Sequence, residues 1–268
     1  MSLNLRQILE GVAEGRIGVD EAEKLIRLTA VEEIENLAKL DVSRELRRGI
    51  PEVILAQGKT PEQVTTIVLR AVAARRKTII SRVGEDHEKA IRNAIPEGVR
   101  LVKNELARMV AVEPRGSRRE LLAGSVGILT AGTSDIRVAE EARFVLERLG
   151  CKTVCSYDVG VAGLQRLFSS LKTMAREDVD ALIVVAGMEG ALPTVVAGLV
   201  GVPVIAVPTS TGYGFGGRGR AALQSMLQAC SLGVAVVNID SGIAAGMVAL
   251  LIVRRLVSRT AKTRSAGP

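Results

Sequence analysis

One loop of small and polar residues contains side chains that could bind an anion. Residues 130–135 read Thr-Ala-Gly-Thr-Ser-Asp and lead directly into a helical pattern. Small residues let the backbone approach a ligand, and free N–H groups at a helix start attract negative charge. Ser134 and Asp135 are equally suited to cap that helix, because both side chains accept hydrogen bonds from backbone N–H groups. The residues alone leave both roles open.

A carboxylate and a thiol are candidates for proton transfer and nucleophilic attack. Glu189 lies in the glycine-flanked loop 186–193, where a carboxylate could exchange a proton with a substrate. Cys230 follows a helical pattern, and no histidine lies nearby in sequence to form a protease-like pair. The alternatives are a solvent-facing Glu189 and a Cys230 that is only a small packing residue.

A glycine-rich loop imitates a dinucleotide fingerprint. Gly212, Gly214 and Gly217 match the Gly-x-Gly-x-x-Gly pattern, and Asp240 follows further on. However, Gly212 comes several residues after the preceding apolar run, and the match does not open the fold. This placement argues against a nicotinamide dehydrogenase and leaves a loop that could lie over a ring or phosphates.

These loops follow a regular series of apolar segments. Each segment precedes a loop and a helical pattern, at residues 126–129, 153–157, 181–185, 204–207 and 234–239. Five such units predict an α/β fold, a flavodoxin-like three-layer parallel sheet with helices on both faces, over residues 121–258. Ligands bind such sheets beyond the carboxyl ends of the strands, where the loops above lie.

The first half predicts a smaller helical and α/β domain. Apolar residues at helical spacing indicate a helical hairpin over residues 1–29. A small α/β domain follows over residues 30–120, with strands at 52–56, 77–83 and 109–112, and helices from Thr60-Pro61 and from about Glu85. The apolar stretch 243–257 is shorter than the roughly 20 residues of a membrane span and predicts a buried helix. Residues 259–268 are expected to be a disordered basic tail.

Composition favours a small ligand over a nucleic acid. The net charge is +7, but it is spread over the chain, and aromatic residues are only 2%. Without interleaved aromatic residues for base stacking, a small anionic ligand fits better. Three cysteines and one histidine do not form a zinc pattern, so no metal site is expected. The odd cysteine count and the lack of a signal peptide favour reduced thiols in the cytoplasm.

Five motifs follow one another along the second half of the chain. They are Ala-Gly-Thr-Ser-Asp at 131–135, Tyr-Asp-Val-Gly-Val-Ala-Gly at 157–163, Val-Ala-Gly-Met-Glu-Gly-Ala-Leu-Pro at 185–193, Val-Pro-Thr-Ser at 207–210, and Cys230 followed by Val-Asn-Ile-Asp-Ser-Gly at 237–242. This series resembles the LarB family of pyridinium-3,5-biscarboxylate mononucleotide synthases. The likeness extends into the first half through residues 47–53 and 57–62.

The resemblance implies a carboxylase that belongs with the aminoimidazole ribonucleotide carboxylases and mutases of purine synthesis. Those enzymes have a catalytic histidine just before the Leu-Pro pair, where this chain has Ala191. The LarB family carboxylates C5 of the pyridinium ring of nicotinic acid adenine dinucleotide with CO₂ or bicarbonate, and hydrolyses the phosphoanhydride to release AMP. Mg²⁺ would accompany the pyrophosphate, and the chain would form a homo-oligomer, an octamer as in the purine enzymes.

The resemblance also assigns roles to residues. Cys230 matches the nucleophile that adds to C4 of the ring, and Glu189 is the acid/base group. Substrate or CO₂ binding falls to the loops that follow the strands, namely Gly132, Thr133, Ser134, Asp135, Tyr157, Asp158, Gly187, Met188, Gly190, Leu192, Pro193, Thr209, Ser210, Tyr213, Gly214, Asn238 and Asp240. The alternatives are a purine carboxylase or mutase and a nucleotide-binding module without catalytic activity.

Overall fold

The computed structural model describes residues 5–29, 32–34, 38–40, 50, 52–74, 77–116 and 121–265. The chain divides into two compact units. The N-terminal unit comprises Met1–Lys103 and Arg108–Ser117, and the C-terminal unit comprises Asn104–Ala107 and Arg118–Pro268. Each unit has its own sheet and is described separately.

The C-terminal unit is built on a parallel sheet of five strands. These are β7 (Ser125–Thr130), β8 (Lys152–Ser156), β9 (Ala181–Ala186), β10 (Val204–Pro208) and β11 (Val234–Val236). They are arranged in the order β11-β10-β9-β7-β8, and every described pairing is parallel. This is the flavodoxin-like order, and it confirms the predicted fold class. The strand order reverses at β7, so a crevice opens beyond its carboxyl end.

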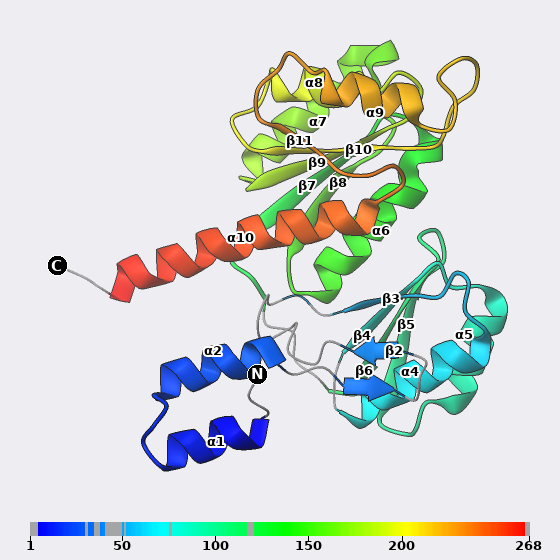
Figure 1. Cartoon of the computed structure of the whole chain (residues 1–268). Helices are drawn as coiled ribbons and strands as arrows, with labels where there is room; N and C mark the ends of the chain where they lie inside the picture. Colours follow the sequence, from blue (N-terminus) through cyan, green and yellow to red (C-terminus); the bar gives the residue numbers. More distant parts are fainter. Residues whose placement is uncertain are drawn as a thin grey trace. The chain divides into compact units, whose positions relative to one another are not determined.

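Helices cover both faces of this sheet. Figure 1 shows α6 and α10 on one face, and α7, α8 and α9 on the other. The bounds of these helices are Ile136–Arg148 for α6, Leu164–Arg176 for α7, Leu192–Ala197 for α8, Arg220–Leu227 for α9 and Gly242–Ser265 for α10, with single 3₁₀ turns at Thr133–Asp135 and Val161–Gly163.

The central strands form the core of this unit. Every residue of β7, β9 and β10 is buried, because Val, Ile, Leu and Ala side chains meet helices on both sides. On the α7, α8 and α9 face, Leu167, Leu192 and Met226 pack against strand residues such as Leu182 and Val184. This packing fixes the strand ends from which the predicted loops emerge.

Two glycines allow α10 to lie close to α6. A Cβ on Gly246 would be 2.6 Å from Val145 Cγ2 and 3.1 Å from the Ala142 carbonyl oxygen. A Cβ on Gly242 would meet the Val138 carbonyl oxygen. Because both positions lack a side chain, the two helices approach each other over the first turns of α10.

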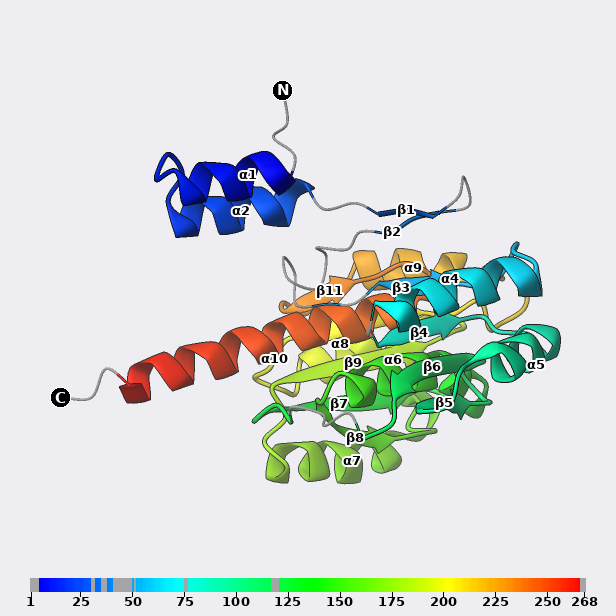
Figure 2. The same cartoon turned by 90° about the horizontal axis from the view of Figure 1, so that it is seen from below.

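The N-terminal unit contains a four-stranded sheet in the order β3-β4-β6-β5. Its strands are β3 (Val53–Leu55), β4 (Thr78–Ser81), β5 (Val99–Asn104) and β6 (Met109–Pro114), and its helices are α4 (Pro61–Ala73) and α5 (Glu85–Ala94). Thr60 caps α4 as predicted, in a reciprocal capping box with Gln63. The helical hairpin consists of α1 (Leu5–Ala13) and α2 (Val19–Thr29), followed by a small antiparallel pair, β1 (Glu32–Ile34) and β2 (Ala38–Leu40). Figure 2 shows both parts from a second side.

Two local predictions differ from the structure. The last strand ends at Val236 and not at residue 239, and the chain turns into α10 after Asp240, which adopts a left-handed backbone conformation. Residues 259–265 of the expected tail are helical, since α10 continues to Ser265 through residues that contain no Gly or Pro, and residues 266–268 lie outside the described residues. The stretch 243–257 is helical as predicted and is buried along one face of α10: Ala249 and Val253 are buried, and Leu251 and Leu256 are exposed. Within the described residues, no helix is long and apolar enough to cross a membrane.

Candidate active site

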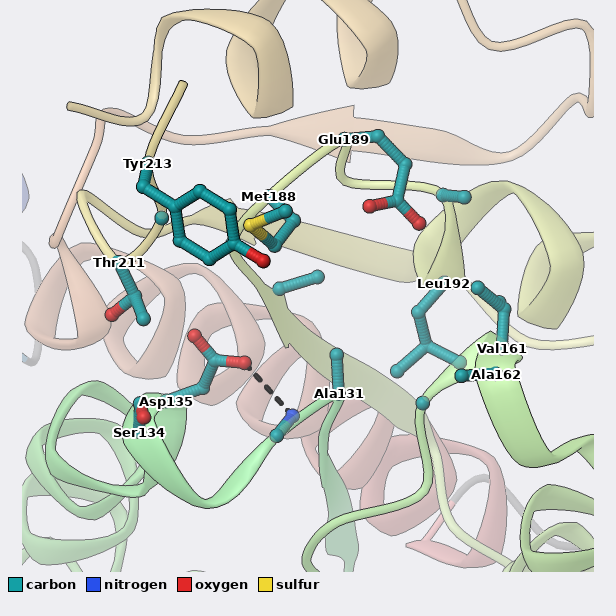
Figure 3. A pocket seen from close by; sticks show the side chains of 16 residues that line it. Ala131, Ser134, Asp135, Val161, Ala162, Met188, Glu189, Leu192, Thr211 and Tyr213 are labelled. Carbon is teal, nitrogen blue, oxygen red and sulfur yellow. Dashed lines mark hydrogen bonds between the residues drawn. The ribbon is translucent and has the colours of Figure 1, made fainter. Parts of the chain in front are cut away.

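A cavity of about 440 Å³ opens beyond the carboxyl ends of β7, β8, β9 and β10. Four loops line it, namely the one after β7 (Ala131 to Asp135), after β8 (Gly160 to Ala162), after β9 (Gly187 to Leu192) and after β10 (Thr211 to Tyr213). Its volume lies within the usual range for a small-molecule site. Figure 3 shows the side chains that face it. The cavity therefore lies where the strand order reverses.

Asp135 lies at the base of this cavity and is held by three loops. Its Oδ2 accepts a hydrogen bond from the Gly132 N–H at 2.9 Å, and its Oδ1 accepts one from Thr209 Oγ1 at 2.6 Å. Burial raises the pKa of this carboxyl, an effect that the hydrogen bonds from Thr209, Gly132 and the Gly187 backbone oppose. Asp135 therefore takes up a proton more readily than an exposed aspartate and remains fixed in place.

The loop after β9 carries Glu189 at the edge of the cavity. Met188 adopts a left-handed conformation (φ 48°), and its N–H donates to the Thr211 carbonyl at 3.1 Å. Gly190 also has a positive φ of 66°, and a Cβ there would be 2.8 Å from Ala222 Cα. This tight turn places the exposed Glu189 across the cavity from Asp135 (Figure 3).

The wall between the two carboxylates is apolar. Val161, Ala162 and Leu192 lie on one side of the cavity in Figure 3, and Tyr213 lies on the other. Among the described lining residues there is no lysine, arginine or histidine. Such a surface suits a flat ring or CO₂, and the two carboxyl groups can exchange protons with a bound ring.

The structure brings eight of the predicted binding and catalytic residues to this cavity. They are Gly132, Ser134, Asp135, Gly187, Met188, Glu189, Leu192 and Tyr213. The other predicted residues, all outside the lining, are Thr133, Tyr157, Asp158, Gly190, Pro193, Thr209, Ser210, Gly214, Cys230, Asn238 and Asp240. Thr209 does not line the cavity, but its hydroxyl donates a hydrogen bond to Asp135, which does. Asp240 accepts a hydrogen bond from the Ser210 N–H at 2.9 Å.

Tyr157 and Asp158 have other partners. The Tyr157 hydroxyl donates to Glu140 of α6 at 2.5 Å. Burial and this hydrogen bond to Glu140 both raise the pKa of Tyr157. Asp158 forms an ion pair with Arg166 of α7, next to the segment 160–162. Neither side chain points into the cavity as the structure stands.

Cys230 is exposed and lies outside the cavity lining. It follows α9 and precedes β11, so it lies at the amino end of the parallel sheet. The cavity lies at the carboxyl end. Of the two groups that the resemblance pairs, Glu189 lines the cavity and Cys230 does not.

Sequence reasoning gave no role to five further lining residues, namely Ala131, Gly160, Val161, Ala162 and Ala186. Three others had been noted: Ala191 at the position of the purine enzymes' histidine, and Thr211 and Gly212 within the glycine-rich loop. Most are small or apolar, so residue type alone gives no chemical signal. Gly160 allows the loop after β8 to lie close to the loop after β7, because a Cβ at this position would be 2.6 Å from the Ala131 carbonyl oxygen. Only the structure shows this close approach.

The residues present do not form a cage for a divalent cation. Among the residues that the structure describes, no three His, Cys, Asp or Glu side chains gather to hold a metal ion. Asp135 and Glu189 are the only carboxylates in the lining, and both oxygens of Asp135 already accept hydrogen bonds. A Mg²⁺ ion would thus depend on oxygen ligands from a substrate.

Comparisons with known proteins agree with this architecture. Residues 31–115 match the family model for a LarB/PurE-like N-terminal domain, and residues 125–264 match the model for AIR carboxylase. An uncharacterized protein of Methanocaldococcus jannaschii is 45% identical over 257 residues, which cover 95% of this chain and 98% of that protein. The N5-carboxyaminoimidazole ribonucleotide mutase of the same organism is 34% identical over 127 residues, covering 47% of this chain and 76% of that enzyme.

Proposed function

Since the chain belongs to the AIR carboxylase family and has a LarB/PurE-like N-terminal domain, we propose that it carboxylates a pyridinium ring. The proposed substrate is nicotinic acid adenine dinucleotide, with CO₂ or bicarbonate as the second substrate. Hydrolysis of the phosphoanhydride would then release AMP and pyridinium-3,5-biscarboxylate mononucleotide. Membership of the AIR carboxylase family supports carboxylation as the type of reaction. The apolar wall of the cavity supports an aromatic ring as the substrate.

The observation that carries this proposal is Ala191 in the wall of the cavity. In the purine carboxylases and mutases, the resemblance described in the sequence analysis implies a catalytic histidine at this position. The single histidine of this chain, His87, lies in the N-terminal unit, where its Nε2 is 2.9 Å from the Lys59 carbonyl oxygen. The cavity therefore lacks the imidazole for the purine reaction, and its apolar wall accommodates an aromatic ring instead.

The proposed chemistry balances without an external oxidant or reductant. A thiolate adds to C4 of the electron-poor pyridinium, which becomes a dienamine with a nucleophilic C5. C5 forms a bond to CO₂, and the C5 proton leaves to Glu189. Expulsion of the thiolate restores the aromatic ring. The net change replaces C5–H by C5–carboxylate and releases one proton.

Each group in the cavity has a role in this sequence. The apolar wall at Val161, Ala162 and Leu192 excludes water and holds the ring and CO₂. Asp135, whose pKa is raised by burial, can donate a hydrogen bond to a carboxylate when it is protonated. Mg²⁺ would act as a counter-ion of the substrate's pyrophosphate, since the residues present do not form a cage for it.

A direct test uses purified protein, the dinucleotide, ¹³C-bicarbonate and Mg²⁺, followed by mass spectrometry. We expect AMP together with a mononucleotide that carries one ¹³C-carboxylate. Glu189→Gln should lower the rate by about 10²-fold or more, as loss of a general base does. AMP without ¹³C incorporation would show that the protein is only a pyrophosphatase. The absence of both products would refute the proposal.

The runner-up, a purine carboxylase or mutase, is supported by the likeness to the Methanocaldococcus mutase. The same preparation should therefore be incubated with N5-carboxyaminoimidazole ribonucleotide. We expect no conversion, because Ala191 provides no proton shuttle. Turnover of this substrate, with none of the dinucleotide, would replace the proposed function by the runner-up.

A further inference from the structure

The cavity contains acidic side chains and no basic ones. Asp135 and Glu189 line it, and its described lining includes no lysine, arginine or histidine. The proposed dinucleotide carries a pyrophosphate, whose negative charges are repelled by carboxylates. Its two bases are joined through two riboses and two phosphates, so the second base can lie well outside a cavity that holds the first. The phosphates and the second base therefore need partners on the loops around the cavity mouth.

Two of the loops that line the cavity lead to arginine side chains. After β8, Arg166 forms an ion pair with Asp158 at 2.5 Å, so its charge is already compensated. After β10, Arg218 and Arg220 are both exposed. Among the residues that the structure describes, neither of these two guanidinium groups has a hydrogen bond or an ion pair. The loop after β10 thus offers positive charge that is available to a ligand.

Both ends of this loop, residues 211–219, lie beside the cavity. Its first residues are part of the cavity lining. At its last residue, Gly219, a Cβ would be 2.8 Å from the Thr209 carbonyl oxygen. Thr209 directly follows β10, and its hydroxyl donates to Asp135 in the cavity at 2.6 Å. The backbone of Arg218 therefore lies next to the strand end from which the cavity loop emerges.

Two aromatic side chains of the same loop are exposed to solvent. The sequence contains two tyrosines, three phenylalanines and no tryptophan, and one of each of the first two types occurs here, at Tyr213 and Phe215. Tyr213 is 82% exposed although it lines the cavity, and Phe215 is fully exposed. Figure 3 shows the Tyr213 ring at the side of the cavity. Because burial of aromatic surface is favourable, two exposed rings beside a ligand site indicate that a flat group of the ligand covers them.

The residue between the two aromatic side chains gives the loop room to adjust to a ligand. Gly214 has a φ of 76°, which residues other than glycine rarely adopt, and nothing lies within 4 Å of the position of a Cβ. The backbone can therefore rotate at Gly214 without a clash, and the rings of Tyr213 and Phe215 can turn toward a base at the cavity mouth.

We propose that the loop 211–219 binds the second nucleotide of the substrate. Tyr213 and Phe215 stack on its base, and Arg218 neutralises the pyrophosphate, while the ring that is carboxylated occupies the cavity. The inference rests on the proposed function, because that reaction uses a dinucleotide. It adds the residues by which the protein distinguishes a dinucleotide from a mononucleotide. Stacking on an aromatic side chain contributes to the affinity for any base, since every base has a π-face.

Calorimetric titration of the full chain with two probes measures the contribution of this loop. Wild-type protein should bind nicotinic acid adenine dinucleotide at least about 10-fold more tightly than nicotinic acid mononucleotide, since only the dinucleotide has a second base. Phe215→Ala should weaken dinucleotide binding about 10-fold and leave mononucleotide binding within about twofold. Arg218→Asn removes the charge and keeps a residue that tolerates the left-handed backbone. It should also weaken dinucleotide binding about 10-fold, and this loss should shrink as the salt concentration rises.

Matched controls come from α7 of the same unit, where Phe168 and Arg176 are also exposed. Phe168→Ala and Arg176→Asn should leave the binding of both probes unchanged. In the carboxylation assay, Phe215→Ala should raise the KM for the dinucleotide about 10-fold and keep kcat within about twofold of wild type. The reason is that a contact with the second base is the same in the ground state and in the transition state.

These measurements separate the inference from the proposed function. If wild-type protein fails to carboxylate the dinucleotide but binds it as described, and both variants weaken that binding, the loop site stands and the proposed reaction fails. If wild-type protein carboxylates the dinucleotide and either Phe215→Ala or Arg218→Asn behaves like its control, the reaction stands and the inference is overturned. Equal affinity of wild-type protein for the two probes, or no binding of either, would also overturn it.

Discussion

Two buried carboxylates of the C-terminal unit respond to their surroundings in opposite directions. Burial raises the pKa of Asp135, and its hydrogen bonds do not fully compensate. Burial also acts on Glu140, but hydrogen bonds from Tyr157, Asn104 and Arg143 outweigh it and lower the pKa. Asp135 is therefore protonated more readily in the folded state than an ordinary aspartate, whereas Glu140 holds its charge more firmly than an ordinary glutamate. The difference lies in the number and charge of their partners.

A pH series on single variants can measure this contrast. The ionised form of Asp135 is disfavoured in the fold, so its contribution to stability is present below the unfolded pKa and is lost as pH rises through the raised folded pKa. Asp135→Asn should therefore gain melting temperature relative to wild type between pH 4 and pH 7. A relative loss over that range would contradict the assigned cause.

Glu140→Gln is the matched control with the opposite sign. The lowered pKa of Glu140 gives stability that is present above its unfolded value and is lost as pH falls through the folded one. At pH 7 the variant should lose about 1–3 kcal/mol, because the partners of a buried carboxylate are left unsatisfied. The difference from wild type should shrink in acid. Chemical denaturation at several pH values would measure it.

Residue type predicted the polar residues of the cavity, and the resemblance added non-polar residues such as Gly132, Met188 and Leu192. Asp135, Ser134 and Glu189 are recognisable because their side chains can act chemically. Val161 and Ala162 have no such signal, and only the three-dimensional path of the loop after β8 brings them to the wall. Tyr157 shows the converse: a polar residue in a recognised motif bonds to Glu140 of α6 instead.

At the scale of elements, the contact between α10 and α6 depends on positions without side chains. Gly246→Val should destabilise the protein by about 1–3 kcal/mol, because the added carbons would overlap Val145 and the Ala142 carbonyl. The exposed Ser258, on the same helix, provides a control. Ser258→Ala should change stability by less than about 0.5 kcal/mol. Equal effects of both substitutions in thermal unfolding would show that the two helices do not pack as described.

The five parallel strands were predictable because runs of Val, Ile and Leu are bounded by turn residues. Strand β5 was not predicted, since Arg100 and Lys103 interrupt its apolar pattern and only Leu101 and Val99 pack inward. The end of α10 was also missed: basic residues suggested a tail, but Ala261 and Lys262 are good helix formers. Charge alone does not distinguish an exposed helix from a tail.

At the scale of the whole molecule, the expected homo-oligomer can be tested directly through its molar mass. Light scattering should show an assembly and no monomer at micromolar concentration. Leu232→Glu should reduce the assembly's size, since it places a charge in the stretch 221–239, which contains no charged residue and exposes Leu227 and Leu232. The circular dichroism spectrum should stay unchanged, because Leu232 is 92% exposed and has little packing within its own chain.

Lys172→Glu, on the exposed side of α7, is the control for charge and should leave the assembly intact. An unchanged molar mass for Leu232→Glu would show that this surface remains open to solvent. A monomeric wild-type protein would contradict the expected homo-oligomer. The expected octamer stays a prediction until the mass is measured.

The position of α10 has a consequence for how the chain acquires its structure during synthesis. This helix follows all five strands in sequence, yet it covers the same face of the sheet as α6, which follows the first of these strands, β7 (Figure 1). While a ribosome is still translating residues 242–265, this face of the sheet is covered by α6 and lacks the cover that α10 gives to β9 and β10. The N-terminal unit, whose residues end at Ser117, has already emerged by then. The first unit can thus fold during translation, whereas the second cannot complete its fold until α10 has been made.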